Sequence, residues 1–100
     1  MLIREDRNGD TVLLAIEGRI DNATSTILDG EISKCLIRIT VQKLILDFSK
    51  VEYISSAGIR VLLGAKKRLK KDRELIIRSP SEFCKQVFNV TGADIFLDIE

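Results

Sequence analysis

Short apolar runs alternate along this chain with longer segments in which apolar residues recur at helical spacing. Val12–Ile16, Leu44–Leu46 and Leu75–Ile77 contain no polar residue, which is typical of strands that are buried on both faces of a sheet. Strands that alternate with helices favour an α/β fold. We therefore expect a mixed β-sheet of four to five strands with helices packed on it.

The size and composition of the chain indicate a single domain over residues 1–100. Its 45% hydrophobic and 31% charged residues are ordinary values for a folded globular protein and exclude disorder. No apolar run approaches the roughly 18 residues that a membrane helix requires, so no membrane span is expected. Met1–Asp10 is charged almost at once and does not resemble a secretory signal. These features predict a cytoplasmic protein.

The first half of the chain predicts a hairpin followed by a helix. Asn8-Gly9 is a signal for a type I′ turn, so Met1–Glu17 is expected to form two antiparallel strands, with Gly18 ending the second. A helix is expected from Ala23 to about Arg38. Its inner stripe comprises Leu28, Ile32, Cys35, Leu36 and Ile39.

The second half predicts alternating strands and helices. Strands are expected at Lys43–Phe48 and Glu74–Arg78, with a helix at Ala57–Lys71 between them. The inner residues of this helix are Ile59, Leu62, Leu63 and Leu69, and its basic residues face outward.

A third helix is expected after Ser79, which would be its N-cap. Pro80 would take the first helical position and Glu82 the capping-box position, and Gly92 would close the helix. A short last strand is expected at Ile95–Leu97. The inner stripe of the helix comprises Phe83, Val87 and Val90. The complete order of elements is thus ββ-α-β-α-β-α-β.

The composition argues against catalysis. Histidine is absent, which removes the commonest general base and zinc ligand. The chain has neither a Gly-x-Ser-x-Gly elbow nor a phosphate-binding loop with its lysine. We expect no enzyme activity, no cofactor and no metal site. Cys35 and Cys84 lie in apolar surroundings and are expected to be buried, reduced thiols.

The charge of the chain is unevenly distributed. Arg60–Arg73 holds seven basic residues and one acid, although the whole chain is only +1. The resulting basic ridge, Lys66–Arg73, is expected to be the solvated face of a helix. No aromatic residue is interleaved with it for base stacking, so direct nucleic-acid binding is not expected. The ridge could instead meet an acidic patch on a protein partner.

Ser55-Ser56-Ala57-Gly58 opens the helix that follows the central strand. In this interpretation the strand ends at Asp47 and a loop leads to the serines. One serine is suited to cap the helix, which leaves its neighbour exposed beside two small residues. A helix N-terminus tolerates a phosphate group. The residues themselves leave both roles open, capping and modification.

Asp47–Gly64, DFSKVEYISSAGIRVLLG, resembles the signature of the STAS domain of bacterial anti-sigma factor antagonists. Gly18-Arg19-Ile20-Asp21 resembles the Gly-x-Leu/Ile-Asp turn upstream in that family. The length and element order also match, so the likeness covers nearly the whole chain. It implies a STAS-type single domain.

The resemblance implies a phosphorylation switch. Family members bind an anti-sigma factor, a serine kinase of histidine-kinase-like ATPase fold, and displace the sigma factor that it holds. The kinase phosphorylates a serine that aligns with Ser56, and a PP2C-type phosphatase reverses the reaction. The family usually has Asp where this chain has Ser55, and often Ser or Thr where it has Ala57. The alternative is a non-phosphorylated STAS docking subunit of a lipid-transport or sensory complex.

The expected partner-binding surface centres on the start of the helix. Gly58 is expected to let a partner backbone approach, so that Gly58→Arg abolishes binding with little change in melting. Asp21 resembles a family position near the serine, but it could equally be the N-cap of a helix from Asn22 or Ala23. The surface comprises Asp21, Ser55, Ser56, Ala57, Gly58 and Ile59.

Overall fold

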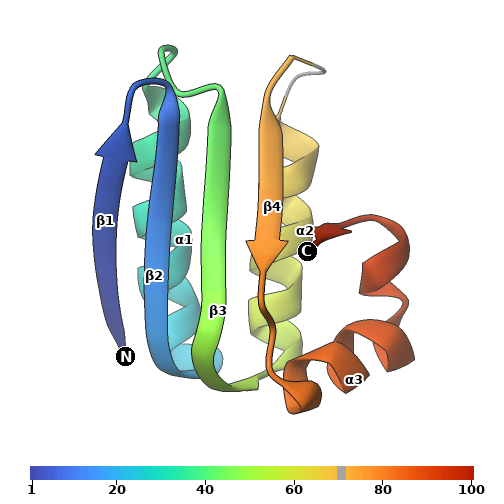
Figure 1. Cartoon of the computed structure of the whole chain (residues 1–100). Coiled ribbons are helices and arrows are strands. Elements are labelled where there is room, and N and C mark those ends of the chain that lie inside the picture. The colour runs from blue at the N-terminus through green and yellow to red at the C-terminus, as the bar shows by residue number, and fades with distance from the viewer. Residues whose placement is uncertain (70–71) are drawn as a thin grey trace.

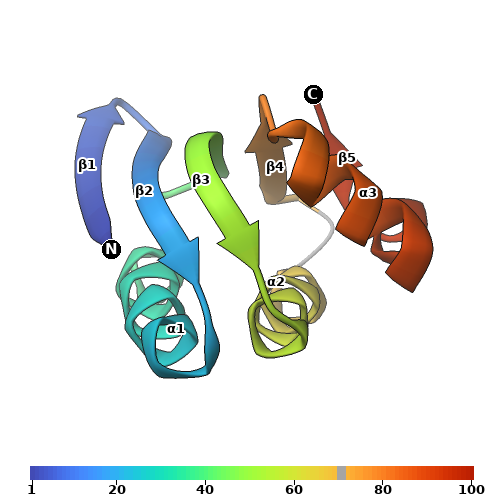
Figure 2. The same cartoon turned by 90° about the horizontal axis from the view of Figure 1, so that it is seen from below.

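The computed structural model describes residues 1–69 and 72–100. Within them, five strands form one sheet in the order β1-β2-β3-β4-β5. Helices α1 and α2 cover one face of the sheet, and α3 lies beyond the end of β4 (Figures 1 and 2). The elements are β1 Leu2–Asn8, β2 Thr11–Ile20, α1 Asn22–Ile37, β3 Lys43–Ile54, α2 Ser56–Arg68, β4 Glu74–Arg78, α3 Glu82–Thr91, the 3-10 turn η1 Ala93–Ile95 and β5 Asp98–Ile99.

The strand directions confirm the predicted mixed α/β sheet. β1 runs antiparallel to β2, whereas the pairs β2–β3, β3–β4 and β4–β5 are parallel. Each parallel connection contains a helix, as crossover connections require. The predicted order of strands and helices is confirmed, with the short η1 turn added before the last strand.

The hairpin is confirmed, but its turn is not the expected type I′. Asn8 pairs with Thr11, so Gly9 and Asp10 form the two-residue loop. Gly9 has φ of +64°, and Asp10 is not among the described residues with positive φ. A positive φ at the first central residue alone is characteristic of type II′.

Gly18 does not end β2 as expected, because the strand continues to Ile20. The pairing of β2 with β3 shifts register between Ala15 and Glu17 and again between Gly18 and Arg19. Gly18 has φ of +109°, a backbone conformation that favours glycine and suits such an irregularity.

The central strand β3 is twice as long as predicted, and no loop follows Asp47. Beyond Asp47 the strand keeps its pairing with β2 as far as Ile54. The alternation of buried and exposed residues in β3 changes just after Asp47. At this point the Asp47 carboxylate accepts a hydrogen bond from the Ser49 N–H at 2.9 Å. Val51 and Ile54 are buried although Ser49 is exposed. β3 therefore delivers the chain directly to the first residues of α2.

The core lies between the sheet and the two helices. The predicted inner residues of α1 are confirmed for Leu28, Ile32 and Cys35, which are fully buried. Leu36 is only partly buried, and Ile39 lies outside the helix and is exposed.

Helix α2 buries Ile59 and Leu62, as predicted, and also Ala65. Leu63 is only partly buried. The helix ends at Arg68 with Leu69 as its C-cap. The expected end at Lys71 falls among residues 70 and 71, which lie outside the described part.

Helix α3 begins later than predicted and buries a different stripe. Its N-cap is Ser81, whose side chain accepts a hydrogen bond from the Cys84 N–H. Glu82 is the first helical residue and not a capping-box residue, and Pro80 precedes the helix. Gly92 adopts the left-handed conformation at the C-cap, as expected.

The buried residues of α3 are Cys84 and Phe88. Phe83 and Val90 are exposed, contrary to the predicted inner stripe, and Val87 is partly buried. The Phe88 ring packs on Phe48 of β3 with a centroid distance of 6.0 Å. β4 pairs with β3 only as far as Asp47, and α3 packs against the part of β3 that β4 leaves open.

The last strand is Asp98–Ile99 and not Ile95–Leu97, because Ala93–Ile95 forms a 3-10 turn. Both cysteines are free and buried, as expected. No helix in residues 1–69 and 72–100 combines the length and apolar character needed to cross a bilayer.

Candidate functional site

The carboxyl ends of β2 and β3 bring the starts of α1 and α2 together. Ile20 and Ile54, the last residues of these strands, are paired in register. The Ser55 N–H donates a hydrogen bond to the Ile20 carbonyl oxygen at 2.8 Å. Figure 2 shows both helices beginning at this end of the sheet. The predicted site residues from the two halves of the sequence therefore lie at one edge of the molecule.

The two serines at the start of α2 have different roles. Ser55 is the N-cap, and its Oγ accepts a hydrogen bond from the Gly58 N–H at 3.3 Å. Ser56 is the first helical residue and is exposed. Its side chain has no hydrogen-bond partner within the described residues. Capping therefore accounts for Ser55 and leaves the Ser56 hydroxyl free.

The electrostatic surroundings of Ser56 are suited to an added anion. The first turn of α2 contains no acidic residue, so the positive end of the helix dipole is not neutralised there. Arg60 lies one turn further along α2 and is exposed. A phosphate group on Ser56 would lie close to free backbone N–H groups.

Asp21 is the N-cap of α1, which confirms one of its two expected roles. One carboxylate oxygen accepts hydrogen bonds from the N–H groups of Ala23 and Thr24 at 3.0 and 2.9 Å. In return, the Asp21 N–H donates to the Thr24 hydroxyl at 2.8 Å, which completes a capping box. The hydrogen bonds from Thr24 hold the pKa of Asp21 below its ordinary value.

Gly58 faces the core and not a partner. A Cβ atom at this position would lie 2.7 Å from side-chain carbons of both Ile20 and Ile54. The glycine thus allows α2 to pack closely against the ends of β2 and β3. The expectation that Gly58→Arg leaves the melting curve almost unchanged is wrong, because an arginine side chain has no space there. Ile59 is also buried, so neither residue offers a surface for direct contact.

Residues 3–100 match the model of the STAS domain. This match spans nearly all of the described sheet and helices. The chain belongs to the STAS domain family. The resemblance carried by Asp47–Gly64 is thereby confirmed.

Individual relatives of this STAS domain are named as anti-sigma factor antagonists. BtrV of Bordetella bronchiseptica, which bears that name, is 26% identical over 93 residues, covering 92% of this chain and 79% of BtrV. An anti-sigma factor antagonist from Mycobacterium paratuberculosis has a TM-score of 0.90 at 19% identity, covering 98% of this chain and 83% of that one. Unphosphorylated SpoIIAA has a TM-score of 0.82 at 20% identity, covering 99% and 88%. These solved structures share the fold of the chain.

The surface of this STAS domain beside Ser56 includes an exposed stack that the sequence interpretation missed. The Arg19 guanidinium lies 4.3 Å from the centre of the Tyr53 ring. The Tyr53 ring in turn lies 5.4 Å from the ring of Phe83 on α3. Arg19 and Tyr53 are register partners in β2 and β3. The available signal was the aromatic residue of the STAS signature, three residues before Ser56.

A shallow hollow on the other side of Ser56 runs along α2 toward α1. Ala57, the remaining predicted contact residue, lines it and is partly exposed. The other lining residues are Asp29, Arg60, Val61, Gly64 and Arg68. Of the predicted surface, Ser56 and Ala57 are therefore accessible, whereas Asp21 and Ser55 hold the two helix starts in place.

The basic ridge is partly used within the STAS domain. Arg68 pairs with Asp29 of α1 at 3.2 Å, and Lys66 with Asp98 of β5 at 3.1 Å. The Arg73 guanidinium donates to the carbonyl oxygens of Leu36, Arg38 and Val41 near the end of α1. The ridge members Lys70 and Lys71 lie outside the described residues. Arg73 thus turns inward, contrary to the expectation of a wholly solvated ridge.

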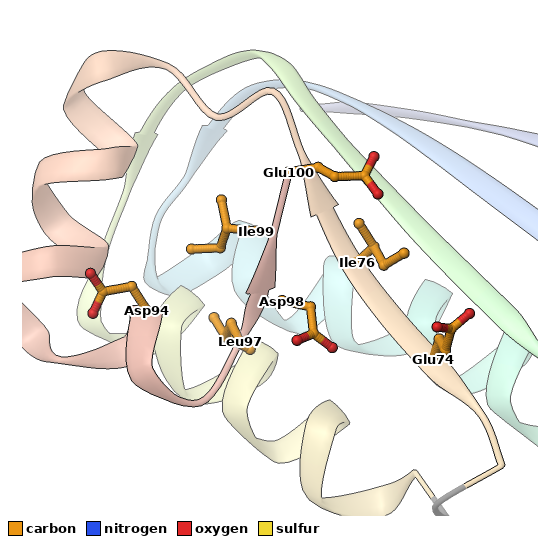
Figure 3. Close-up of a pocket in the computed structure, with 7 residues that line it drawn as sticks. All are labelled: Glu74, Ile76, Asp94, Leu97, Asp98, Ile99 and Glu100. Atoms are coloured by element: carbon orange, nitrogen blue, oxygen red, sulfur yellow. The ribbon is translucent and has the colours of Figure 1, made fainter.

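A separate hollow lies away from the two serines, between β4 and β5 (Figure 3). Four carboxylates line it, but their side chains are spread around its rim and do not meet at one point. Two of the four are paired with cations, since Arg78 contacts Glu100 at 3.3 Å and Lys66 contacts Asp98. The lining carboxylates are Glu74, Asp94, Asp98 and Glu100. This hollow does not have the arrangement of a metal site.

Proposed function

We propose that this STAS domain is an anti-sigma factor antagonist whose binding is controlled by phosphorylation of Ser56. Its partner is an anti-sigma factor kinase of histidine-kinase-like ATPase fold, and binding releases the sigma factor that the kinase holds. The observation that carries the proposal is the free, exposed Ser56 hydroxyl at the N-terminus of α2. The docking surface comprises Ser56, Ala57 and the exposed side chains around them.

The names of similar proteins support this function. BtrV and the protein from Mycobacterium paratuberculosis are both named as anti-sigma factor antagonists. SpoIIAA, which has the same fold, has been solved in an unphosphorylated and in a phosphorylated form. A phosphorylated state is therefore compatible with this fold.

The departure at Ser55 is compatible with a phosphorylated Ser56. The family usually has aspartate at this position, and aspartate and serine are comparably effective N-caps. Ser55 performs that capping role here through its hydrogen bond with the Gly58 N–H. The substitution keeps the start of α2 in place and removes one negative charge beside the acceptor hydroxyl.

The switch follows from the charge of the added group. The kinase would transfer the γ-phosphoryl group of ATP to the Ser56 oxygen, releasing ADP and the hydroxyl proton. The phosphate adds about −1.5 to −2 charges at pH 7. In the complex with the kinase this charge must be desolvated, which weakens binding. In the unbound protein the phosphate lies at the N-terminus of α2, where it causes no strain. A PP2C-type phosphatase would restore the binding form by hydrolysis.

The test is phosphopeptide mass spectrometry after incubation with ATP and a candidate anti-sigma factor kinase from the same organism. We expect label on Ser56 in the wild type and in Ser55→Ala. In binding assays, Ser56→Ala should bind the kinase constitutively. Ser56→Asp should bind at least about tenfold more weakly, which corresponds to about 1.4 kcal/mol.

Two results would contradict the switch in different ways. Label on Ser55 would place the acceptor one residue earlier than proposed. Kinase binding with neither serine labelled would favour the alternative, a STAS docking subunit without a switch. The Ser55→Ala protein serves as the matched control, because it changes the cap and keeps the proposed acceptor.

A further inference from the structure

Within the described part of the chain, strand β1 has no neighbouring strand along one of its edges. It pairs with β2 over all of Leu2–Asn8 with no register shift, and in the described structure it is the outermost strand of the sheet on that side. It contains no proline. Bulges, prolines and covering elements are the usual means of protecting an edge strand, and β1 has none of them among the described residues.

The hairpin geometry determines which residues of β1 direct their backbone N–H and C=O groups toward the open edge of the sheet. In an antiparallel pair, alternate residues direct their N–H and C=O groups to the partner strand. Asn8 and Thr11 flank the two-residue turn and form the first such pair. By this alternation, the backbone groups of Ile3, Glu5 and Arg7 point away from β2. They form a regular template for another strand.

We infer that a second copy of this chain pairs with β1 in antiparallel fashion, centred on Glu5. The charges of the strand are complementary under this symmetry, because Arg4 of each copy comes opposite Asp6 of the other. Opposite charges at directly facing positions favour strand pairing. Charges on an edge strand usually discourage association. Here the charges of Arg4 and Asp6 discourage pairing with other strands, but they are complementary to an antiparallel copy of the same strand.

The central pair of glutamates does not oppose this arrangement. In each copy Glu5 is held by Arg38 through two contacts of 3.0 and 3.3 Å. This ion pair places a positive charge next to each Glu5 carboxylate. Arg7 is held in turn by a hydrogen bond to the Thr40 hydroxyl at 3.0 Å.

The flank of α1 next to β1 adds a second complementary surface. Ile27, Glu31 and Lys34 are spaced at i, i+4 and i+7 and share a helix face with Arg38, which reaches β1 through Glu5. Ile27 is an apolar side chain that is 55% exposed. Lys34 and Glu31 form an ion pair at 3.2 Å. A two-fold axis at Glu5 brings these flanks toward each other in antiparallel orientation.

The dimer leaves the proposed switch accessible in both copies. A two-fold axis through antiparallel β1 strands reverses the direction of every strand in the second copy. The carboxyl ends of the two β3 strands, and with them the two Ser56 residues, then lie at opposite ends of a continuous sheet. Each copy can engage its own partner. The inference does not depend on Ser56 being phosphorylated.

The test exchanges the charges of Arg4 and Asp6 at the proposed interface. The oligomeric state of each variant is measured by size-exclusion chromatography with light scattering. At about 100 μM, well above a micromolar Kd, the wild type should be a dimer that dissociates on dilution. Arg4→Asp makes both facing side chains of each cross-strand pair acidic, and Asp6→Arg makes both basic, so each variant alone should be monomeric. An equimolar mixture of the two should form a heterodimer. The double variant should dimerise with itself.

Controls separate pairing from folding. No ion pair within residues 1–69 and 72–100 involves Arg4 or Asp6, so the variants should keep the wild-type melting temperature when all proteins are diluted until the wild type is monomeric. Glu52→Arg reverses the charge of an exposed acidic residue of β3 and should leave the dimer intact. A monomeric wild type at this concentration would overturn the inference. A dimer that survives both single variants, or a mixture that stays monomeric, would overturn it as well.

Discussion

At the scale of single residues, the two glycines of α2 form a natural comparison. A Cβ atom at Gly58 would meet Ile20 and Ile54 at 2.7 Å, whereas one at Gly64 would meet nothing within 4 Å among the residues that the structure describes. The same substitution should therefore have opposite effects at the two positions. Gly58 is part of the packing between helix and strands, and Gly64 is a helix glycine in an open hollow.

We predict that Gly58→Ala lowers the free energy of unfolding by about 1–3 kcal/mol, because the added methyl group overpacks the contact. Gly64→Ala should raise it by about 0.5–1 kcal/mol, since alanine is the better helix former and has space. Urea denaturation of both variants beside the wild type measures the difference. Similar small changes at both sites would contradict the close packing of Gly58.

Asp21 should make stability sensitive to acid. Its pKa is lowered in the folded state, mainly by hydrogen bonds from Thr24, from an ordinary value of 3.8. A lowered pKa means that its stabilising contribution is present above about pH 4 and is lost as the pH falls through the folded-state pKa. Asp21→Asn retains a good N-cap that does not titrate.

The expected result is that the melting temperature of the wild type falls more steeply than that of Asp21→Asn between about pH 4 and about pH 2, by differential scanning calorimetry. Glu5, whose pKa is also lowered by its bond to Arg38, is present in both proteins and cancels in the comparison. Parallel curves would show that the Asp21 charge does not stabilise the start of α1.

At the scale of elements, the sequence predicts well where local patterns and tertiary packing agree. Strand β4 has the predicted bounds, Glu74–Arg78, because an uninterrupted apolar run is buried on both faces there. Strand β3 is longer than predicted because Phe48, Val51 and Ile54 are buried at intervals of three. Register shifts between β2 and β3 produce that spacing, and such irregularities are not visible in one strand alone.

Helix α3 shows how two equally plausible local signals are resolved by distant contacts. Ser79 and Ser81 are both good caps, and Glu82 favours Ser79 by spacing. However, the Ser79 N–H donates to the carbonyl oxygen of Glu100, 21 residues away, at 3.1 Å. This contact holds Ser79 at the end of the sheet with φ of +54°. The helix therefore begins after Ser81.

We predict opposite effects of substitution at these two serines. Ser81→Ala should lower the free energy of unfolding by about 1 kcal/mol through loss of the cap. Ser79→Gly should raise it by up to about 1 kcal/mol, since glycine adopts positive φ without strain. Thermal denaturation followed by circular dichroism measures both. Destabilisation by Ser79→Gly with no effect of Ser81→Ala would restore Ser79 as the cap.

At the scale of the whole molecule, the element order and the single sheet were predictable, but the placement of α3 was not. The helix has two apolar stripes, one with Phe83, Val87 and Val90 and one with Cys84 and Phe88. Periodicity alone cannot choose between them. The stripe with Cys84 is buried because β4 is short and leaves Phe48 and Val51 of β3 open beside it, where the Cys84 thiol contacts the Val51 carbonyl oxygen.

The candidate site was predictable only where it depends on local sequence signals, and not where it depends on contacts between distant segments. The start of α2 was visible as a capping signal, and the structure assigns the cap to Ser55 and exposure to Ser56. Gly58 packs against Ile20, which is 38 residues earlier in the sequence. The two residues meet only because β2 pairs with β3. A small residue in a motif can serve either a partner or the core, and only the pairing of strands distinguishes them.

The two cysteines provide a test of whether these layers unfold as one unit. Cys35 on α1 and Cys84 on α3 belong to the same buried core cluster, and burial raises the pKa of both thiols. Native protein should therefore react with iodoacetamide at neither site, and both sites should become reactive together across the urea transition. Mass spectrometry of the labelled peptides measures each site separately. If Cys84 were alkylated in native buffer while Cys35 stayed protected, α3 would be opening independently of the sheet, and its packing on β3 would be weaker than the shared core implies.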